Sequence, residues 1–65
     1  MQINVNGVGQ TLHAATVAAA LDELGYGDAI VATALNGHFV ASASRAAATL
    51  ADGDALEILA PMQGG

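Results

Sequence analysis

The sequence predicts an α+β fold in which one main helix covers one mixed sheet, with the element order β-β-α-β-β-β. Two observations predict it. Apolar and polar residues alternate over several short segments, as in strands, and the spacing becomes helical only in residues 16–25. Asn-Gly pairs at 6–7 and 36–37 follow strand-like segments and favour hairpin turns. With 65 residues, the chain has room for one domain.

A hairpin is predicted at the start of the chain. Residues 1–5 alternate apolar and polar side chains, which predicts a half-buried strand. The pair at 6–7 favours a turn, although Gly9 indicates a loop wider than two residues. Residues 10–13 then form a short returning strand.

The helix is predicted within residues 16–25. Its larger apolar residues recur at i, i+4 and i+7 and so share one face: Val17, Leu21 and Leu24. The Thr16 hydroxyl is expected to cap the first turn, and Gly25 supplies the left-handed residue after the last turn. Asp22 and Glu23 lie near the negative end of the helix dipole, which is mildly unfavourable. We expect them on a solvated face, with a partner contact as the alternative.

Two further strands are predicted on either side of the second Asn-Gly pair. Residues 29–35 are β-branched and apolar, which predicts a strand buried on much of both faces, and the pattern does not decide which alternate set faces the helix. Residues 38–41 form the returning strand. Residues 42–50 favour neither helix nor loop, and residues 51–54 form a turn with Gly53 at a position of positive φ.

The last strand is predicted at residues 55–60, where two apolar side chains fall on one face and Leu59 falls on the other. Pro61 ends the strand, because proline cannot donate to a sheet ladder. We therefore expect a domain over residues 1–60 and a flexible functional tail over residues 61–65.

The charge balance restricts the class of partner. The formal net charge is -5, and Arg45 is the only lysine or arginine. Nucleic-acid binding needs basic groups to neutralise phosphates, so this composition argues against it, and an acidic membrane surface would repel the chain. A partner with a basic face fits, although net charge also serves solubility. Arg45 is expected to be solvated or paired with an acid, with a partner contact as the alternative.

The chain is expected to be soluble and cytoplasmic. Its apolar runs are much shorter than the about 20 residues that cross a bilayer. Residues 1–6 lack the basic region that begins a signal peptide.

Sites for catalysis or metal binding within residues 1–60 are weak candidates. The two histidines lack a thiol or carboxylate at metal spacing, and the two serines lack a readable His–Asp pair. The GVG segment at 7–9 lacks the third glycine of a phosphate-binding loop. The candidates considered are His13, His38, Ser42, Ser44, Asp52 and Asp54. We expect the two aspartates to form a turn, and we predict that the protein is not an enzyme.

The Gly64–Gly65 pair is the strongest chemical signal. Glycine has no Cβ and can pass through a narrow channel in a partner enzyme, and Met62 and Gln63 give that partner side chains to contact. Joining the Gly65 carboxylate to AMP would install a good leaving group. Because the sequence contains no cysteine, sulfur could be carried covalently only as a thiocarboxylate at Gly65.

Several segments together resemble the ThiS family, the ubiquitin-like sulfur carriers of thiamine biosynthesis. They are INVNG, TVAAALDELG, VATALNG, LADGDALEIL and the final QGG. The resemblance implies a β-grasp fold. Many members carry Pro-Arg after the strand that follows the second Asn-Gly pair, whereas this chain has Ala41-Ser42, which puts local partner contacts in doubt.

The resemblance also implies a mechanism. A ThiF-like (E1-like) adenylyltransferase uses Mg-ATP to adenylate Gly65, a sulfur-relay protein converts the adenylate to a thiocarboxylate, and a ThiG-like thiazole synthase takes the sulfur. The carrier itself binds no cofactor. Gly64, Gln63 and Met62 would thread into the partner, and we predict that an exposed Leu59 contributes to docking.

Two other functions fit the same residues. The first is a sulfur carrier of another pathway, such as the small subunit of molybdopterin synthase or a carrier for cysteine synthesis. The second is a β-grasp module that docks without covalent chemistry. Deletion of Gly65 separates them, because it would abolish sulfur transfer but leave docking intact.

Overall fold

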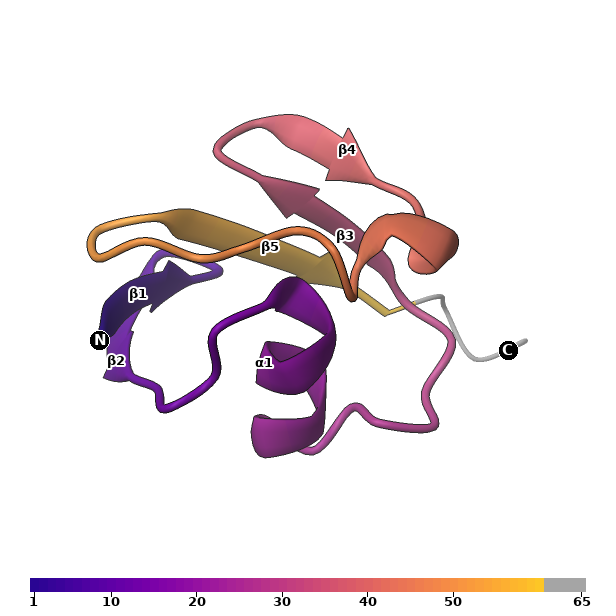
Figure 1. Ribbon diagram of the computed structural model, residues 1–65, viewed down its shortest axis with the longest axis horizontal. Coiled ribbons are helices and arrows are strands. Elements are labelled where there is room, and N and C mark those ends of the chain that lie inside the picture. The colour runs from indigo at the N-terminus through magenta and orange to yellow at the C-terminus, as the bar shows by residue number, and fades with distance from the viewer. Residues whose placement is uncertain (61–65) are drawn as a thin grey trace.

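The computed structural model of the chain describes residues 1–60, and the predicted tail at 61–65 lies outside the described residues. The elements are β1 (Gln2–Val5), β2 (Val8–Thr11), α1 (Val17–Glu23), β3 (Ala32–Leu35), β4 (His38–Val40), the 3-10 helix η1 (Ser42–Ser44) and β5 (Ala55–Leu59). Helix α1 crosses one face of the sheet (Figure 1). The predicted α+β fold and the β-β-α-β-β-β order are therefore confirmed, with η1 added between the last two strands.

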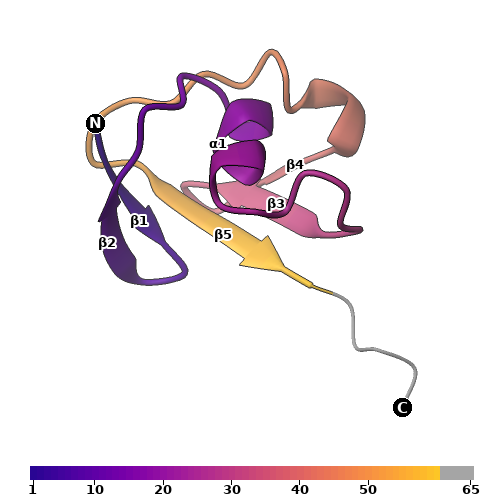
Figure 2. The same ribbon diagram turned by 90° about the horizontal axis from the view of Figure 1, so that it is seen from below.

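The five strands form one mixed sheet in the order β2-β1-β5-β3-β4. Strand β5 runs parallel to β1, with Asn4 opposite Ala55 and Val5 opposite Leu56, and antiparallel to β3. The last strand within residues 1–60 is thus the central strand of the sheet, between the β1–β2 hairpin and the β3–β4 hairpin (Figure 2).

The first hairpin has a tighter turn than predicted. Val5 pairs with Val8, so the loop contains only Asn6 (φ 52°) and Gly7 (φ 84°). Positive φ at both positions is the geometry that matches the twist of two paired strands. Gly9 pairs with Asn4 inside β2. The expected wider loop is wrong, and β2 consequently begins and ends two residues earlier than predicted.

Both predicted ends of α1 are confirmed. The Thr16 hydroxyl accepts a hydrogen bond of 3.1 Å from a first-turn N–H. At the other end Gly25 has φ 92° and donates to the Asp22 carbonyl at 3.1 Å, while Tyr26 N–H donates to the Leu21 carbonyl at 2.7 Å. This pair of bonds is the Schellman motif, which satisfies carbonyls that the helix leaves free.

Glu23 has a structural role that the sequence analysis missed. Its carboxylate accepts from the His13 N–H at 3.0 Å and from the Ala14 N–H at 2.9 Å. These bonds connect the last turn of α1 to the loop that precedes the helix. The His13 N–H, assisted by the Ala14 N–H, lowers the pKa of Glu23. Glu23 is exposed, as expected, but its bonds to the loop were not predicted.

Strand β3 is shorter than predicted and is buried on one face only. The strand begins at Ala32, three residues after the predicted start at residue 29. Thr33 is 2% exposed, whereas Ala32 is exposed and Ile30, before the strand, is 84% exposed. Because α1 covers only one side of the sheet, the expected burial of both faces is wrong. The predicted second turn is confirmed, with Asn36 at φ 52°.

Arg45 fastens the segment after β4 to β3. Its Nε donates to the Thr33 hydroxyl at 3.1 Å and its Nη2 donates to the Val31 carbonyl at 2.6 Å. The Thr33 hydroxyl in turn donates to the Val40 carbonyl at 2.8 Å, which explains how a polar side chain is accommodated in the core. The expectation of a solvated or acid-paired arginine is wrong.

The turn before β5 is confirmed. Gly53 has φ 88°, and the Asp54 carboxylate accepts from the Ala51 N–H at 2.8 Å and from the Asn36 side-chain amide at 3.0 Å. The Asn36 amide, together with the Ala51 N–H, lowers the pKa of Asp54. Asp52 accepts from the Gln2 N–H at 2.6 Å, a contact with a distant segment that was not predicted.

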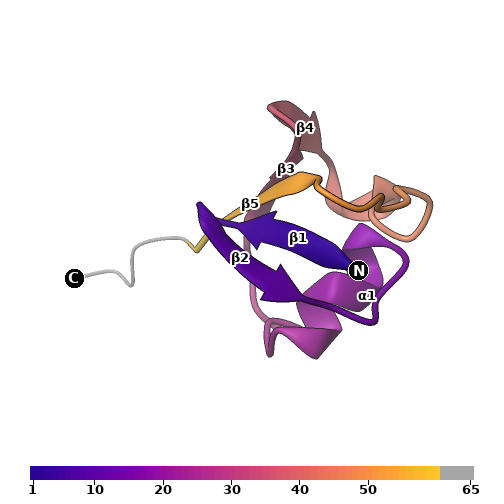
Figure 3. The same ribbon diagram turned by 90° about the vertical axis from the view of Figure 1, so that its left-hand side faces the viewer.

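Helix α1 lies along one face of the sheet (Figure 3), and the hydrophobic core lies between the two. Its buried members are Ile3, Val5, Leu12, Ala14, Val17, Ala20, Leu21, Val31, Leu50, Leu56 and Ile58. Strand β5 contributes Leu56 (0% exposed) and Ile58 (6% exposed) from one face, which confirms the predicted alternation. Within residues 1–60, no helix or loop covers the opposite face of the sheet, which we call the open face (Figure 2).

Candidate functional site

Of the predicted site residues, the structure describes Leu59. It is the last residue of β5, and its side chain is 72% exposed on the sheet face opposite α1. The predicted exposure is confirmed, while the docking role stays a prediction. The other predicted site residues lie outside the described residues: Met62, Gln63, Gly64 and Gly65.

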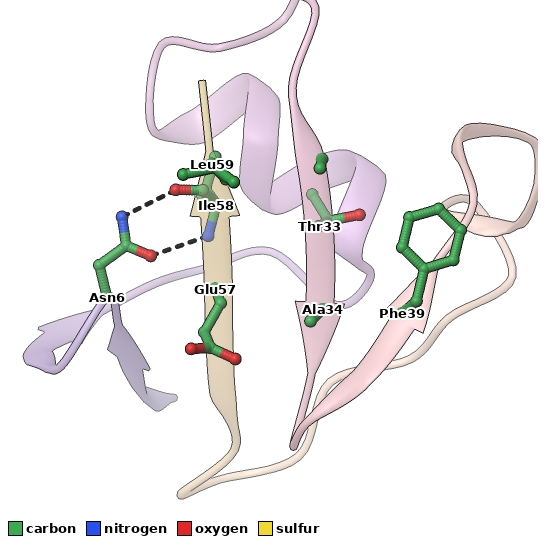
Figure 4. Close-up of a pocket in the computed structure, with 8 residues that line it drawn as sticks. Asn6, Thr33, Ala34, Phe39, Glu57, Ile58 and Leu59 are labelled. Carbon is green, nitrogen blue, oxygen red and sulfur yellow. Dashed lines mark hydrogen bonds between the residues drawn. The ribbon is translucent and has the colours of Figure 1, made fainter. Parts of the chain in front are cut away.

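A shallow hollow of about 450 Å³ lies on the open face beside Leu59 (Figure 4). It is lined by Asn6, Ala32, Thr33, Ala34, Phe39, Glu57, Ile58 and Leu59. The register explains its shape. Ala34 lies opposite both Phe39 on β4 and Glu57 on β5, and Ala32 lies opposite Leu59. The small alanine side chains of β3 therefore leave room between the larger side chains on either side.

The hollow and its surroundings form an apolar surface. Phe39 is 74% exposed and Leu59 is 72% exposed, and the alanines of β3 lie between them. Glu57 adds a carboxylate on the same face. Exposed apolar patches with a polar border are typical of protein contact sites, and the carboxylate favours a partner with a basic group.

Asn6 holds β5 from the first hairpin turn. Its side-chain carbonyl accepts from the Ile58 N–H at 2.8 Å, and its side-chain amide donates to the Ile58 carbonyl at 3.1 Å (Figure 4). Its backbone N–H donates to the Leu56 carbonyl at 3.0 Å. Thus Asn6 makes three bonds to the strand that ends beside the hollow.

The two histidines lie on different elements. His13 follows β2, and His38 begins β4; both are exposed. Within residues 1–60, no three histidine, cysteine, aspartate or glutamate side chains are grouped so that they could hold a metal ion. Nor does any helix in that part of the chain have the length and hydropathy needed to cross a membrane.

The sequence analysis missed Phe39 and the two alanines of β3 as surface residues. A signal for them exists. A two-residue turn places Leu35 opposite His38 and Ala34 opposite Phe39. Because residues opposite one another share a face, the side of the sheet that exposes Ala34 also exposes Phe39. The sequence leaves undecided only which alternate set of β3 faces the helix.

Comparisons with known proteins identify close relatives of this architecture. A family model described as the ThiS family matches residues 3–65. The crystal structure of a thiamine biosynthesis protein (ThiS) from Geobacter metallireducens is 36% identical, with a TM-score of 0.82 over 100% of both chains. An NMR structure of a thiamine biosynthesis protein from the same organism is 35% identical, with a TM-score of 0.81, covering 100% of this chain and 88% of the other. No curated protein matches. The likeness confirms the β-grasp fold.

Proposed function

The chain belongs to the ThiS family, and from this premise we propose that it is a sulfur carrier protein of thiamine biosynthesis. The observation that carries the proposal is the family match, which runs through Gly65 and so includes the Gly-Gly pair. The end-to-end likeness to a thiamine biosynthesis protein supports the same pathway. The chain is then a protein that partner enzymes modify, and it is not itself an enzyme.

The proposed chemistry takes place at the carboxyl group of Gly65. On a ThiF-like adenylyltransferase, a carboxylate oxygen bonds to the α-phosphorus of ATP and pyrophosphate leaves. Sulfide (HS⁻) delivered by a relay protein then attacks the carbonyl carbon, AMP leaves, and loss of a proton gives the thiocarboxylate. A ThiG-like thiazole synthase takes this sulfur into the thiazole ring. ATP and Mg²⁺ belong to the adenylyltransferase, so the carrier needs no cofactor of its own.

We propose that the open sheet face docks the adenylyltransferase while the tail enters its active site. Leu59 and Phe39 supply exposed apolar area on this face, and the net charge of -5 favours a partner with a basic surface. Leu59 is six residues before Gly65, so docking at this point would bring the tail to the enzyme. These partners and this chemistry would place the protein in the cytoplasm.

Intact mass spectrometry tests the proposal. The chain is incubated with a ThiF-like adenylyltransferase, Mg-ATP and sulfide, and a variant without Gly65 is treated in parallel. We expect the mass of the full chain to rise by the replacement of one oxygen atom by sulfur, and the shortened variant to stay unmodified. An unchanged mass, on an enzyme that modifies its own carrier, would contradict the proposal.

Two further readouts separate the alternative functions. A docking module would bind the adenylyltransferase equally well with and without Gly65 and would gain no sulfur. A carrier of another pathway would gain sulfur but fail to rescue growth of thiazole-requiring cells. We expect rescue by the full chain only.

A further inference from the structure

We propose that Asn6 is a positioning residue that holds the end of β5 in place for activation of the tail. This inference rests on the proposed function, because it concerns how Leu59 and the residues after it are presented to the adenylyltransferase. Asn6 lies 59 residues before Gly65, so the sequence alone does not connect it with activation of the Gly65 carboxyl group. Three observations support the assignment.

The first observation is that the Asn6 side chain continues the β1–β5 hydrogen bonds beyond the end of β1. The parallel β1–β5 bonds advance two residues at a time, from Asn4 N–H donating to the Asp54 carbonyl to Asn6 N–H donating to the Leu56 carbonyl. The next group on β5 is the Ile58 N–H. A continued strand β1 would offer it a backbone carbonyl, and here the Asn6 side-chain carbonyl takes that place.

The second observation is the position of these bonds along β5. The β1–β5 pairing ends at Val5 opposite Leu56, whereas the β3–β5 pairing continues to Ala32 opposite Leu59. On the β1 side, the Asn6 side chain therefore bonds both backbone groups of Ile58. Opening a strand end costs little free energy unless contacts such as these hold it in place.

The third observation is that Leu59 directly follows the residue that Asn6 holds. The side chain of Ile58 is buried and that of Leu59 is exposed in the hollow, so fixing Ile58 also fixes where Leu59 leaves the sheet. If the end of β5 opens, the spacing between the docking surface and Gly65 is lost. Only the closed fraction of molecules would then bind productively, which raises the apparent dissociation constant.

The chain contains a matched control in its second Asn-Gly turn. Asn36 has the same φ of 52°. Its side chain also makes two bonds, accepting from the Ala55 N–H at 2.9 Å and donating to the Asp54 carboxylate at 3.0 Å. These contacts hold the beginning of β5, at the end away from Leu59. Glycine at either position keeps the positive φ without strain and removes the side-chain bonds, and its added backbone freedom is common to both variants.

The test compares Asn6→Gly with Asn36→Gly in the full chain. Pyrophosphate release by a ThiF-like adenylyltransferase gives KM and kcat for each carrier, and amide hydrogen exchange reports on β5. We expect the KM of Asn6→Gly to rise about three- to tenfold with kcat nearly unchanged, because two bonds closing a strand end are lost. We expect Asn36→Gly to leave both constants near wild type.

Hydrogen exchange checks the physical cause independently of activation. The Ile58 amide should exchange about tenfold faster in Asn6→Gly, and the Ala55 amide should do so in Asn36→Gly. Equal KM values for the two variants would overturn the proposal, since they would show a general effect of weakening β5. Failure of the wild-type chain to release pyrophosphate would contradict the proposed function instead, and the exchange rates would still decide whether Asn6 holds the strand end.

Asn6→Asp is the second test variant, to be used if Asn6→Gly does not fold. Aspartate also tolerates positive φ and keeps an acceptor for the Ile58 N–H, but it places an oxygen where the amide donated to the Ile58 carbonyl. We expect a raised KM for this variant as well. A KM equal to that of the wild type would overturn the proposal.

Discussion

The two faces of the sheet use apolar side chains for different purposes, and β5 contributes to both. Leu56 and Ile58 are 0% and 6% exposed under α1, whereas Leu59, one residue further along, is 72% exposed on the other face. Phe39 is likewise 74% exposed on that open face. Apolar character alone therefore does not separate the core from a contact surface. The face on which a residue lies separates them.

In strand β3 a polar residue is buried and an apolar residue is exposed. Its polar residue Thr33 is 2% exposed, whereas on the other face Ala32 is exposed and Ala34 is half-buried. Thr33 is tolerated inside because its hydroxyl donates to the Val40 carbonyl and accepts from Arg45. The alanines are small enough to leave the hollow between Phe39 and Leu59.

The largest effect is expected on the covered face. Leu56→Ala should lower the free energy of unfolding by about 2–5 kcal/mol, because it leaves a cavity at a fully buried position in the central strand. Urea denaturation monitored by circular dichroism measures the change. A loss below about 1 kcal/mol would show that this face is less tightly packed than its burial indicates.

A substitution on the open face should change the affinity for the partner and leave the stability of the fold unchanged. Leu59→Asp should weaken binding to the proposed adenylyltransferase about tenfold or more, because an apolar contact is lost and a charge must be desolvated. Unfolding by urea should stay close to that of the wild type, since Leu59 is exposed. Leu59→Met is the control, because it keeps the apolar area. Unchanged affinity of Leu59→Asp would show that docking uses another surface.

Phe39 tests whether the open face contributes to folding. Phe39→Ser should change the free energy of unfolding by no more than about 0.5 kcal/mol, as at other exposed positions. Thermal unfolding by calorimetry provides the measurement. A loss of about 3 kcal/mol, as for a core phenylalanine, would remove the distinction between the two faces.

The smallest effect is expected at Glu23, outside both faces. The His13 and Ala14 N–H groups lower its pKa below 4.5, so its stabilising contribution is present above that pH and is lost as the pH falls through the folded-state value. Glu23→Gln should therefore lower Tm at neutral pH, and the difference from the wild type should shrink in acid. Glu57→Gln is the control for the change in net charge. A Tm difference that did not depend on pH would contradict this origin.

Features set by neighbouring residues could be predicted from the sequence. The two Asn-Gly turns, the Thr16 cap and the Gly25 helix end all depend on residues within a few positions, and the structure contains them. The alternation in β5 was also predicted correctly, because a strand has a period of two wherever it lies in the sheet.

Features set by distant contacts could not be predicted in this way. The alternation of β3 defines two sets of residues but not which set meets α1. The roles of Glu23 and Arg45 depend on loops that come close only in the fold. At the candidate site, the exposure of Leu59 was predicted, whereas Phe39 was missed because the facing of β3 was undecided. The tail residues Met62 to Gly65 stay predictions.

The central position of β5 has a consequence for how the protein is made. Among the described residues, the two hairpins have no sheet contact except through β5, so a growing chain that has reached only residue 54 contains two hairpins that are not joined in one sheet. An isolated hairpin is marginally stable in water. The sheet can therefore close only when residues 55–59 have left the ribosome. An adenylyltransferase that recognises the open face would consequently find no complete surface on an unfinished chain.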